Sequence, residues 1–413
     1  MLHISCFLSY SAIVKQQTLN MLASIFYTSF KRLLFLFTVH MVLFSSITFG
    51  LVEGKYGKIG LGANNSLSYD SNIFSSELNE SDIVQKTTPS ITYSKKLGIV
   101  VATASAGIAV TRYVDHPDQD AYDPQTNFDL DLSGLSDRIG FMKSGGGKLK
   151  FDVFFDVGQN TSTNVIEQDI VSTTNYDAGF DIRYDYSPKF GFGSKLSYGF
   201  SMSDGNASYS DLSNWSLTGR AFYIYSQKLE FYSDYEYKPI SGSGGQTNFI
   251  DSATHAYTVG MSGNVFTKIK GDLYIGYSFK EFDSSSISSD SAITFGGALT
   301  WKMNPKRSLR LSLNRGFSAS AQNQSLLTSN LALALNHRFD NKTSGLISAN
   351  YSTTEYTGSD SRESKTMGLG ATLTRNFNAN ILVGLNYDYS KTINDSSEDF
   401  DRHLATLDFN VTY

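Results

Sequence analysis

Charged side chains recur at every second position in several stretches of this sequence. On a β-strand, alternate side chains point to the same face, so each stretch would present a row of charge along one side. Facing rows of opposite charge along a water-filled passage create a transverse field that selects among permeating solutes. A solvated wall without selectivity is the simpler interpretation, because it needs polar residues of any kind. The candidate lining residues are Lys150, Asp152, Asp156, Asp177, Asp181, Arg183, Asp185, Glu230, Asp234, Glu236 and Arg310.

One of these rows predicts a charge preference. Glu230, Asp234 and Glu236 have no base between them on their own stretch. We therefore expect a lumen with a weak preference for cations. Phe154 and Tyr232 occupy the same alternate positions. An aromatic ring there either stacks on a sugar or fixes the packing and register of the wall, and the sequence leaves both roles open.

The sequence contains no pattern typical of catalysis or metal binding. Its six histidines show no H-E-x-x-H or other close ligand spacing, and neither G-x-S-x-G nor a P-loop occurs. The single cysteine, Cys6, excludes a disulfide framework. His255, His337 and His403 are the candidates for a base assembled from separate strands, but interfacial or turn positions explain them more simply. We predict no catalytic residues, no metal, no cofactor and no enzymatic activity.

The apolar residues between the charges predict the elements that position them. A period of two runs through residues 149–157, 176–186, 229–237, 273–279, 309–313 and 381–389. A helix would not keep these apolar sets on one side. The chain ends in the same pattern, and a strand that ends the chain frays unless it is paired. We expect this terminal strand to close a barrel on the first strand through Leu407, Phe409, Val411 and Tyr413.

The connectors between the strands come in two alternating lengths. Eight tight turns, most with Gly, Pro or Asn, alternate with nine longer polar loops. This predicts an all-β, transmembrane, antiparallel up-and-down β-barrel of about 18 strands (16–18), with short periplasmic turns and longer extracellular loops. A propeller has a similar repeat length, but its blades would contain four short strands per repeat. The longest loop is expected at 158–172, and one tight turn at 144–147.

Aromatic residues near the predicted strand ends suggest contact with the membrane interface. Tyr and Trp favour the level of the lipid headgroups, where they form girdles. The expected girdle residues are Tyr69, Tyr93, Tyr113, Tyr186, Trp215, Tyr237 and Trp301.

Residues 1–50 are interpreted as a signal peptide. Lys31 and Arg32 precede an apolar run over 33–44, and small residues follow up to Gly50. Met21 would be a more usual start for such a peptide. An uncleaved helical anchor over 33–49 is the alternative interpretation. The barrel would then occupy residues 51–413.

The region around the first predicted loop is similar to a known family. The segments Tyr69-Asp70-Ser71-Asn72-Ile73-Phe74, Ser81-Asp82-Ile83-Val84 and Pro89-Ser90-Ile91-Thr92-Tyr93 resemble the start of the putative beta-barrel porin 2 group, which often accompanies exopolysaccharide and capsule gene clusters. The resemblance implies an outer-membrane barrel linked to polysaccharide export, and it supplies no catalytic residues. The matching positions are Asp70, Asn72, Ile73, Ser81, Asp82 and Pro89.

These features together predict a porin-like channel in the outer membrane of a Gram-negative-type bacterium. It would pass small hydrophilic solutes or an exported polysaccharide. The alternative is a non-conducting structural or assembly barrel of an exopolysaccharide or envelope machine. Expected partners are outer-membrane lipid, lipopolysaccharide, the barrel-assembly machinery and polysaccharide-export components. A formal net charge of −5 without a basic patch argues against nucleic acid.

Overall fold

The computed structural model describes residues 52–412 except 99, 134–147, 165–168, 205–208, 246–248, 285–286, 321–323, 358–361 and 396–398. The predicted signal peptide and Tyr413 lie outside the described residues. Leu51–Tyr413 form one compact unit. Among the helices of the described residues, none is long and apolar enough to cross a membrane.

This unit is built from strands in chain order, with one short 3-10 helix. The elements are β1 (Val52–Gly54), β2 (Gly57–Asp70), β3 (Asp82–Leu97), β4 (Val100–Tyr113), η1 (Pro117–Gln119), β5 (Ala121–Asp131), β6 (Lys148–Asn164), β7 (Asp169–Asp185), β8 (Phe190–Asp204), β9 (Asp211–Ser226), β10 (Leu229–Ser243), β11 (Ser252–Phe266), β12 (Ile269–Phe282), β13 (Asp290–Asn304), β14 (Arg307–Ser320), β15 (Gln324–Arg338), β16 (Thr343–Thr357), β17 (Glu363–Asn376), β18 (Ile381–Asn394) and β19 (Phe400–Thr412).

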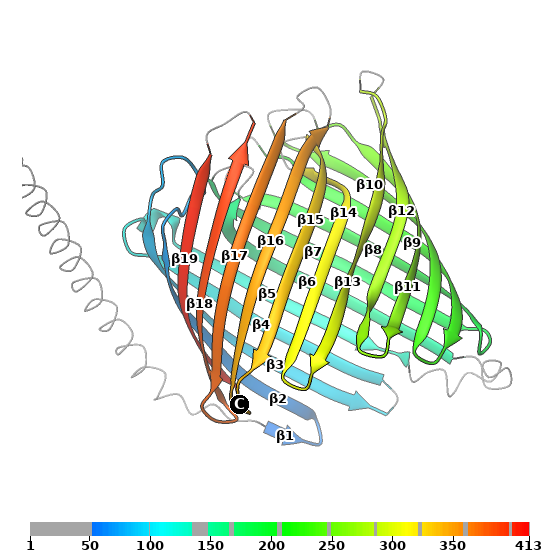
Figure 1. The fold of residues 1–413 in the computed structure, drawn as a ribbon, viewed down its shortest axis with the longest axis horizontal. Coiled ribbons are helices and arrows are strands. Elements are labelled where there is room, and N and C mark those ends of the chain that lie inside the picture. Colours follow the sequence, from blue (N-terminus) through cyan, green and yellow to red (C-terminus); the bar gives the residue numbers. More distant parts are fainter. Residues whose placement is uncertain are drawn as a thin grey trace, which may run out of the picture. The chain divides into compact units, whose positions relative to one another are not determined.

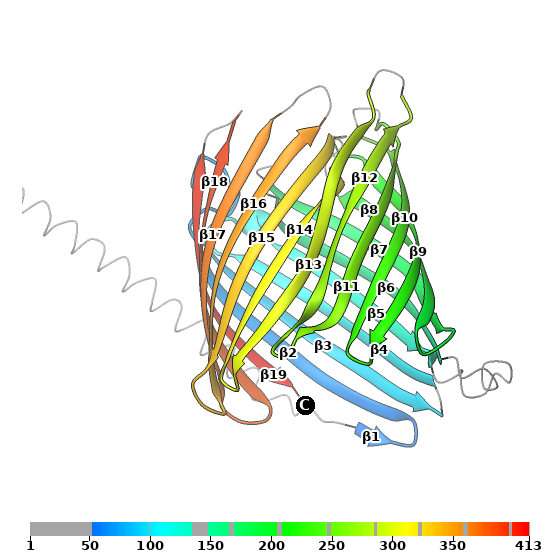
Figure 2. The same cartoon turned by 45° about the vertical axis from the view of Figure 1, so that its right-hand side comes forward.

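The eighteen strands β2–β19 form a closed antiparallel barrel. Each strand pairs with its neighbour in the sequence, and β19 pairs with β2 to complete the ring, with Leu407 opposite Leu67 and Thr406 opposite Ser68. Strand β1 pairs only with the start of β2. Figures 1 and 2 show the strands running obliquely around the wall, with the short turns at the lower end. The predicted barrel, its closing strand and its strand number are confirmed.

The outer face of the wall is apolar and uncovered. Large hydrophobic side chains remain exposed along it: Leu369 on β17 is 60 % exposed and Ile275 on β12 is 57 % exposed. Trp215, Tyr257 and Leu385 on other strands are exposed in the same way. A soluble protein rarely exposes so extensive an apolar surface. The outer face therefore fits lipid, and closure of the ring leaves no backbone edge unpaired within the membrane.

Side-chain oxygens hold several short turns together. Asp340 Oδ1 accepts hydrogen bonds from the backbone N–H groups of Lys342 (2.6 Å) and Thr343 (2.7 Å). Asn378 makes the equivalent pair with Asn380 and Ile381, both at 2.8 Å. Such Asx turns satisfy the donors that a two-strand reversal would otherwise leave free. Because Asp340 accepts these bonds, its pKa is lowered.

The loops at the opposite end are shorter than the sequence suggested. The expected loop 158–172 is mostly strand, because β6 runs to Asn164 and β7 begins at Asp169. The Ser, Thr and Asn residues of this stretch are typical of a loop and predicted one. Their backbones instead continue the hydrogen-bonded pairing of β6 and β7 beyond the apolar part of the wall. The turn expected at 144–147 precedes the start of β6 at Lys148 and stays a prediction. Residues 134–147 lie outside the described residues.

One predicted girdle residue faces the wrong way for that role. Tyr113 lies opposite Val84 on β3, and Asp82 and Lys86 point to the same side of β3 as Val84. This is the inner side of the barrel. The prediction that Tyr113 belongs to the membrane-facing girdle is therefore wrong. The alternation of β4, which is rich in Ala, gave too little signal to fix which side was apolar. Tyr69, Trp215 and Trp301 are exposed, as a girdle requires.

An added charge should destabilise the barrel far more on the outer, apolar face of the wall than on the inner, polar face. We expect Leu369→Arg to lower the free energy of unfolding by about 2–4 kcal/mol, because it places a charge among the lipid chains near the middle of β17. Urea unfolding of the barrel in lipid vesicles, followed by Trp fluorescence, measures this loss.

The matched control is Thr372→Arg, which lies on the inner face of β17 opposite Asn386. It should change stability by less than about 1 kcal/mol, since its guanidinium remains in water. Equal losses for both variants would contradict the assignment of the two faces.

Candidate functional site

The strand register places the predicted lining residues on one face. Across β6 and β7, Lys150 lies opposite Arg183, Asp152 opposite Asp181 and Asp156 opposite Asp177. Facing residues of antiparallel strands point to the same side. Glu230, Asp234 and Glu236 share the corresponding face of β10, and Arg310 that of β14.

Contacts between strands that are not neighbours identify this face as the inner one. Arg183 on β7 reaches Glu230 on β10, and Tyr232 on β10 donates a hydrogen bond to Asp272 on β12 (2.9 Å). Side chains from such separated strands meet only on the concave side of a closed sheet. The lumen is therefore the polar side of the wall. Whether the predicted residues select solutes stays a prediction.

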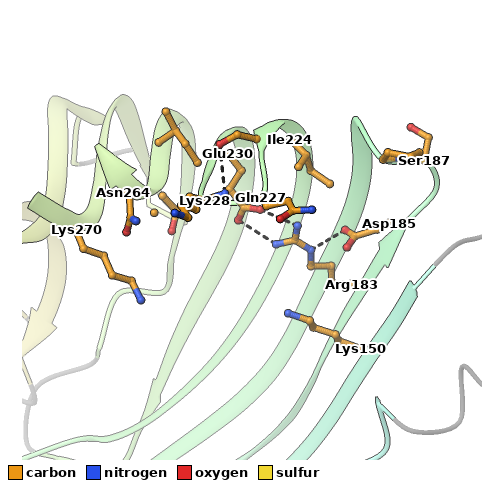
Figure 3. A pocket seen from close by; sticks show the side chains of 15 residues that line it. Lys150, Arg183, Asp185, Ser187, Ile224, Gln227, Lys228, Glu230, Asn264 and Lys270 are labelled. Atoms are coloured by element: carbon orange, nitrogen blue, oxygen red, sulfur yellow. Dashed lines mark hydrogen bonds and ion pairs between the residues drawn. The ribbon is translucent and has the colours of Figure 1, made fainter. Parts of the chain in front are cut away.

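Arg183 joins two carboxylates across the lumen wall. Its Nη1 and Nη2 donate to the two oxygens of Glu230 at 2.9 and 2.7 Å, and its Nε donates to Asp185 at 2.8 Å. The guanidinium also lies 4.0 Å from the centre of the Phe222 ring. This bidentate, stacked arrangement uses the planar geometry that distinguishes arginine from lysine. Figure 3 shows Arg183 between its two acidic partners.

A second arginine repeats this arrangement farther along the wall. Arg220 on β9 pairs with Asp234, its Nε 2.6 Å from Oδ1. Its guanidinium lies 4.2 Å from the centre of the Tyr232 ring. Tyr232 is only 5 % exposed, and its hydroxyl is engaged with Asp272. Between a cation and a carboxylate, this ring is packed into the wall rather than presented to a sugar.

These pairs correct the expected acidic row on β10. Glu230 and Asp234 each have an arginine partner, and Glu236 accepts a hydrogen bond from Ser216 at 2.8 Å. The sequence analysis found no base beside them because it considered one strand at a time. The bases lie on β7 and β9, which closure and register bring to the same face.

A denser group of acids lies on β5, β6 and β7. Asp131, Asp152 and Asp181 are directly opposite one another in a single row across the three strands. Asp156 and Asp177 face each other in a second row. Among the described residues, no cation forms an ion pair with any of these five carboxylates. Like charges directly opposite each other are destabilising, and Lys195 on β8, which lies opposite Asp181, offsets part of this repulsion.

Several inner-face residues were not anticipated from the sequence. Asp129 and Asp131 alternate with Phe128 and Leu130, a pattern that could have been found. The alternation of apolar and polar residues around Arg220 and Lys280 is weaker, because glycines and small polar residues interrupt their strands. Lys280 is 1 % exposed, and its Nζ donates to the Ser318 carbonyl at 3.4 Å.

Two cavities lie on the inner face of the wall between β6 and β15. The larger one, of about 960 Å³, lies at the turn end and is lined by Lys150, Arg183, Lys228, Glu230, Lys270 and neighbouring polar residues. Figure 3 shows Lys150 and Lys270 extending into it from opposite sides. The smaller one, of about 410 Å³, contains Arg220, Asp234 and Lys280. Among the described residues, no group of His, Cys, Asp or Glu has the arrangement of a metal site.

The residues that carried the family resemblance form a buried polar cluster at the loop end of the barrel. Asp70, at the end of β2, accepts from Nε of Arg402 on β19 at 2.9 Å, so the pair bridges the seam. Asn72 is fully buried and fastens the loop 71–81: its Nδ2 donates to the Ser76 carbonyl (2.6 Å) and the Asp401 carbonyl (3.3 Å). Thr163 on β6 donates to the carbonyl of Ile73 at 2.6 Å.

Asp82 anchors the next loop in the same cluster. Its carboxylate accepts from the backbone N–H groups of Val114 (3.0 Å), Asp115 (3.0 Å) and His116 (2.9 Å). The remaining motif positions are simpler. Ser81 is exposed at the end of the loop, and Pro89 lies where the β3–β4 register skips two residues, as expected for a residue without an N–H donor.

The terminal strand completes the seam. Leu407, Phe409 and Val411 lie opposite Leu67, Asn65 and Ala63. Ser68 and Thr406 share a side-chain hydrogen bond of 2.9 Å on the other face of the same two strands.

A family comparison agrees with this architecture. The family described as Putative beta-barrel porin 2 matches residues 62–413. The chain belongs to this family. Of the positions that carried the resemblance, Asp70 bridges the seam and Asn72 fastens the first loop.

Solved structures agree on the fold. The outer membrane protein OpdK of Pseudomonas aeruginosa superposes with a TM-score of 0.51 at 10% identity, over 88% of this chain and 100% of that chain. A BenF-like porin from Pseudomonas fluorescens Pf-5 gives 0.50 at 12% identity, over 87% and 99%. At such identities the likeness concerns the fold alone. A comparison with curated protein sequences gives no match.

The buried ion pair across the seam predicts a specific loss of stability. Asp70→Ala would leave the Arg402 guanidinium without its carboxylate, and we expect about 2–4 kcal/mol less free energy of unfolding, somewhat reduced because Arg402 is partly exposed. Urea unfolding measures it. Asp388→Ala, which removes an inner carboxylate of β18 without an ion pair among the described residues, is the control and should cost less than half as much.

The contacts of His116 predict that the β4–β5 connection is attached to the loop 71–81 in a pH-dependent way. Its Nδ1 faces Asp82 (2.9 Å) and its Nε2 faces Glu80 (3.0 Å), so both nitrogens donate only when the ring is protonated. The bond to Asp82, aided by Glu80, raises the pKa of His116. A raised folded-state pKa stabilises the attachment below the unfolded value of about 6.5, and this contribution disappears as pH rises through the folded value.

Amide hydrogen exchange, corrected for its intrinsic pH dependence, tests this attachment. Residues 72–80 and 114–116 should lose protection as pH rises above about 6.5 and through the raised folded-state pKa of His116. In His116→Gln the protection should be low and independent of pH. A wild-type profile that does not change with pH would refute the role of His116.

Proposed function

We propose that this barrel is an outer-membrane channel for the passive passage of small hydrophilic solutes. The observation that carries the proposal is the closed ring of eighteen strands with a charged, hydrated inner face. Barrels of about 16–18 strands enclose an aqueous channel, whereas eight strands leave an interior filled by side chains. The proposal includes no catalytic step, and solutes move by diffusion.

The contacts of the first loop are compatible with the proposed passage. The loop 71–81 contacts β19, the β4–β5 connection and β6, so its contacts stay on one side of the barrel. The charge pattern supports weak selectivity, because acids gather on β5–β7 while arginines and lysines lie on β7–β9 and β12. A field across the lumen would follow, and the acid-rich wall would favour small cations.

Small solutes fit the lumen better than a polysaccharide chain does. Recognition of a sugar polymer relies on aromatic rings presented to the lumen, but Tyr232 is covered by Arg220 and Phe154 lies 5.6 Å below the Lys195 ammonium. Polysaccharide passage therefore stays a secondary proposal. A non-conducting anchor of an envelope machine stays the alternative. Lipopolysaccharide, the barrel-assembly machinery and polysaccharide-export components are proposed partners in a Gram-negative-type cell.

Single-channel recording in planar bilayers tests the proposal. The refolded barrel should give steady, ohmic steps, and a salt gradient should reveal a preference for cations. Neutralising the acidic wall with Asp152→Asn, Asp156→Asn, Asp177→Asn and Asp181→Asn should reduce the cation-to-anion permeability ratio about twofold or more. Asp388→Asn serves as control and should leave the ratio nearly unchanged.

Two results would overturn parts of this proposal. A β-rich, heat-modifiable barrel that conducts no current would refute the channel and favour the anchoring role. An anion preference that disappears when Lys150 and Arg310 are neutralised would refute the cation preference but leave the channel intact.

A further inference from the structure

The larger cavity at the turn end of the lumen is partly open and has an excess of positive charge. Its charged lining comprises Lys150, Arg183, Lys228 and Lys270 against Asp185 and Glu230. Its volume of about 960 Å³ is in the range of small-ligand sites. We infer that this cavity is a binding subsite for a small solute that carries carboxylate or phosphate groups. This inference rests on the proposed channel function and adds a local anion site at the turn end, while the acid-rich wall of β5–β7 sets the overall preference for small cations.

The two acids of the cavity do not neutralise its lysines. Glu230 makes both of its short contacts to Arg183, and Asp185 accepts from the Nε of the same arginine. The positive charge of Arg183 is thereby balanced by two carboxylates. Within the described part of the chain, Lys150, Lys228 and Lys270 form no ion pair. The cavity therefore has three ammonium groups available for an anion.

The position of Lys150 indicates that the cavity is built for an anion rather than merely solvated. Lys150 lies directly opposite Arg183 on the paired strand. Two cations in that position repel each other. Asp185 and Glu230 compensate Arg183, whereas Lys150 interacts electrostatically with Asp152 on its own strand but forms no ion pair within the described residues. An anionic group between Lys150 and Lys270 would remove this repulsion.

Neutral groups around the lysines would complete a polar site. Gln227, Ser262 and Asn264 line the same cavity, and Lys270 lies opposite Asn264 on the neighbouring strand. Their hydroxyl and amide groups donate and accept hydrogen bonds. The lysines come from β6, the β9–β10 turn and β12, so only the closed barrel brings them together. Figure 3 shows Lys150 and Lys270 directed toward the same space.

Equilibrium binding tests the subsite independently of conduction. Isothermal titration calorimetry would measure the affinity of the refolded barrel in detergent for succinate and, separately, for inorganic phosphate, with glycerol as an uncharged comparison. We expect saturable binding of at least one anion and none of glycerol. The double variant Lys150→Gln, Lys270→Gln should weaken that binding by about tenfold or more, since it removes two charge-assisted contacts.

The matched control is Lys86→Gln. Lys86 lies on the inner face of β3, opposite Thr111 and outside the cavity, and forms no ion pair within the described residues. Its loss should change the affinity by less than about twofold if binding is local. Heat modifiability on a gel confirms that each variant has folded.

The outcomes separate the subsite from the channel. Anion binding that survives the double variant, or that falls equally in Lys86→Gln, would overturn the inference and indicate a diffuse effect of net charge. Absence of binding in a barrel that conducts would overturn the subsite alone. Binding in a barrel that does not conduct would refute the proposed channel while supporting the anion site. Preference between succinate and phosphate identifies the anionic group.

Discussion

Closure of the hydrogen-bond ladder between β19 and β2 is the constraint on which the rest of this structure depends. In lipid, an unpaired N–H or C=O group costs several kcal/mol, so a sheet can span a membrane only when it has no edge. The pairing of Leu407 with Leu67 removes the last two edges. On the inner side of the same seam, Asp70 and Arg402 add an ion pair at the loop end. Asp70, one of the positions that carried the resemblance, therefore reinforces the one junction that local hairpins do not make.

Closure also decides where charge can be placed. Once the sheet is a ring, every second residue of each strand faces either lipid or a shared interior. Side chains from separate strands then meet across the concave face, as Arg183 and Glu230 do. The interior becomes divided by charge: carboxylates face one another on β5–β7, while arginines on β7 and β9 balance the acids of β10. Under the proposed function, this division of charge would allow the channel to discriminate among solutes.

The loop end and the turn end of the barrel differ in physical character. At the loop end, Asn72 and Asp82 are buried and hydrogen-bonded, so the charged groups there hold the loops in place. At the turn end, the lysines of the cavity are open to water and lack acidic partners among the described residues. A saturated polar network stabilises structure, whereas unsatisfied charge in a cavity is available to a ligand. The two ends therefore suit different roles, attachment at one and solute binding at the other.

The sequence by itself determined the fold class, the approximate strand number and the two faces of the strongly alternating strands, but not those of β4. The reason is local: a period of two, as in Tyr176 to Tyr186, and turn residues such as those at 340–342 depend on neighbours in the chain. Loop lengths were misjudged at 158–172 because Ser, Thr and Asn suit loops as well as strand ends. Only the tertiary structure decided which charges are paired. Glu230 appeared unpaired in the sequence, because its partner Arg183 lies 47 positions away and becomes a neighbour only when the sheet curves into a ring.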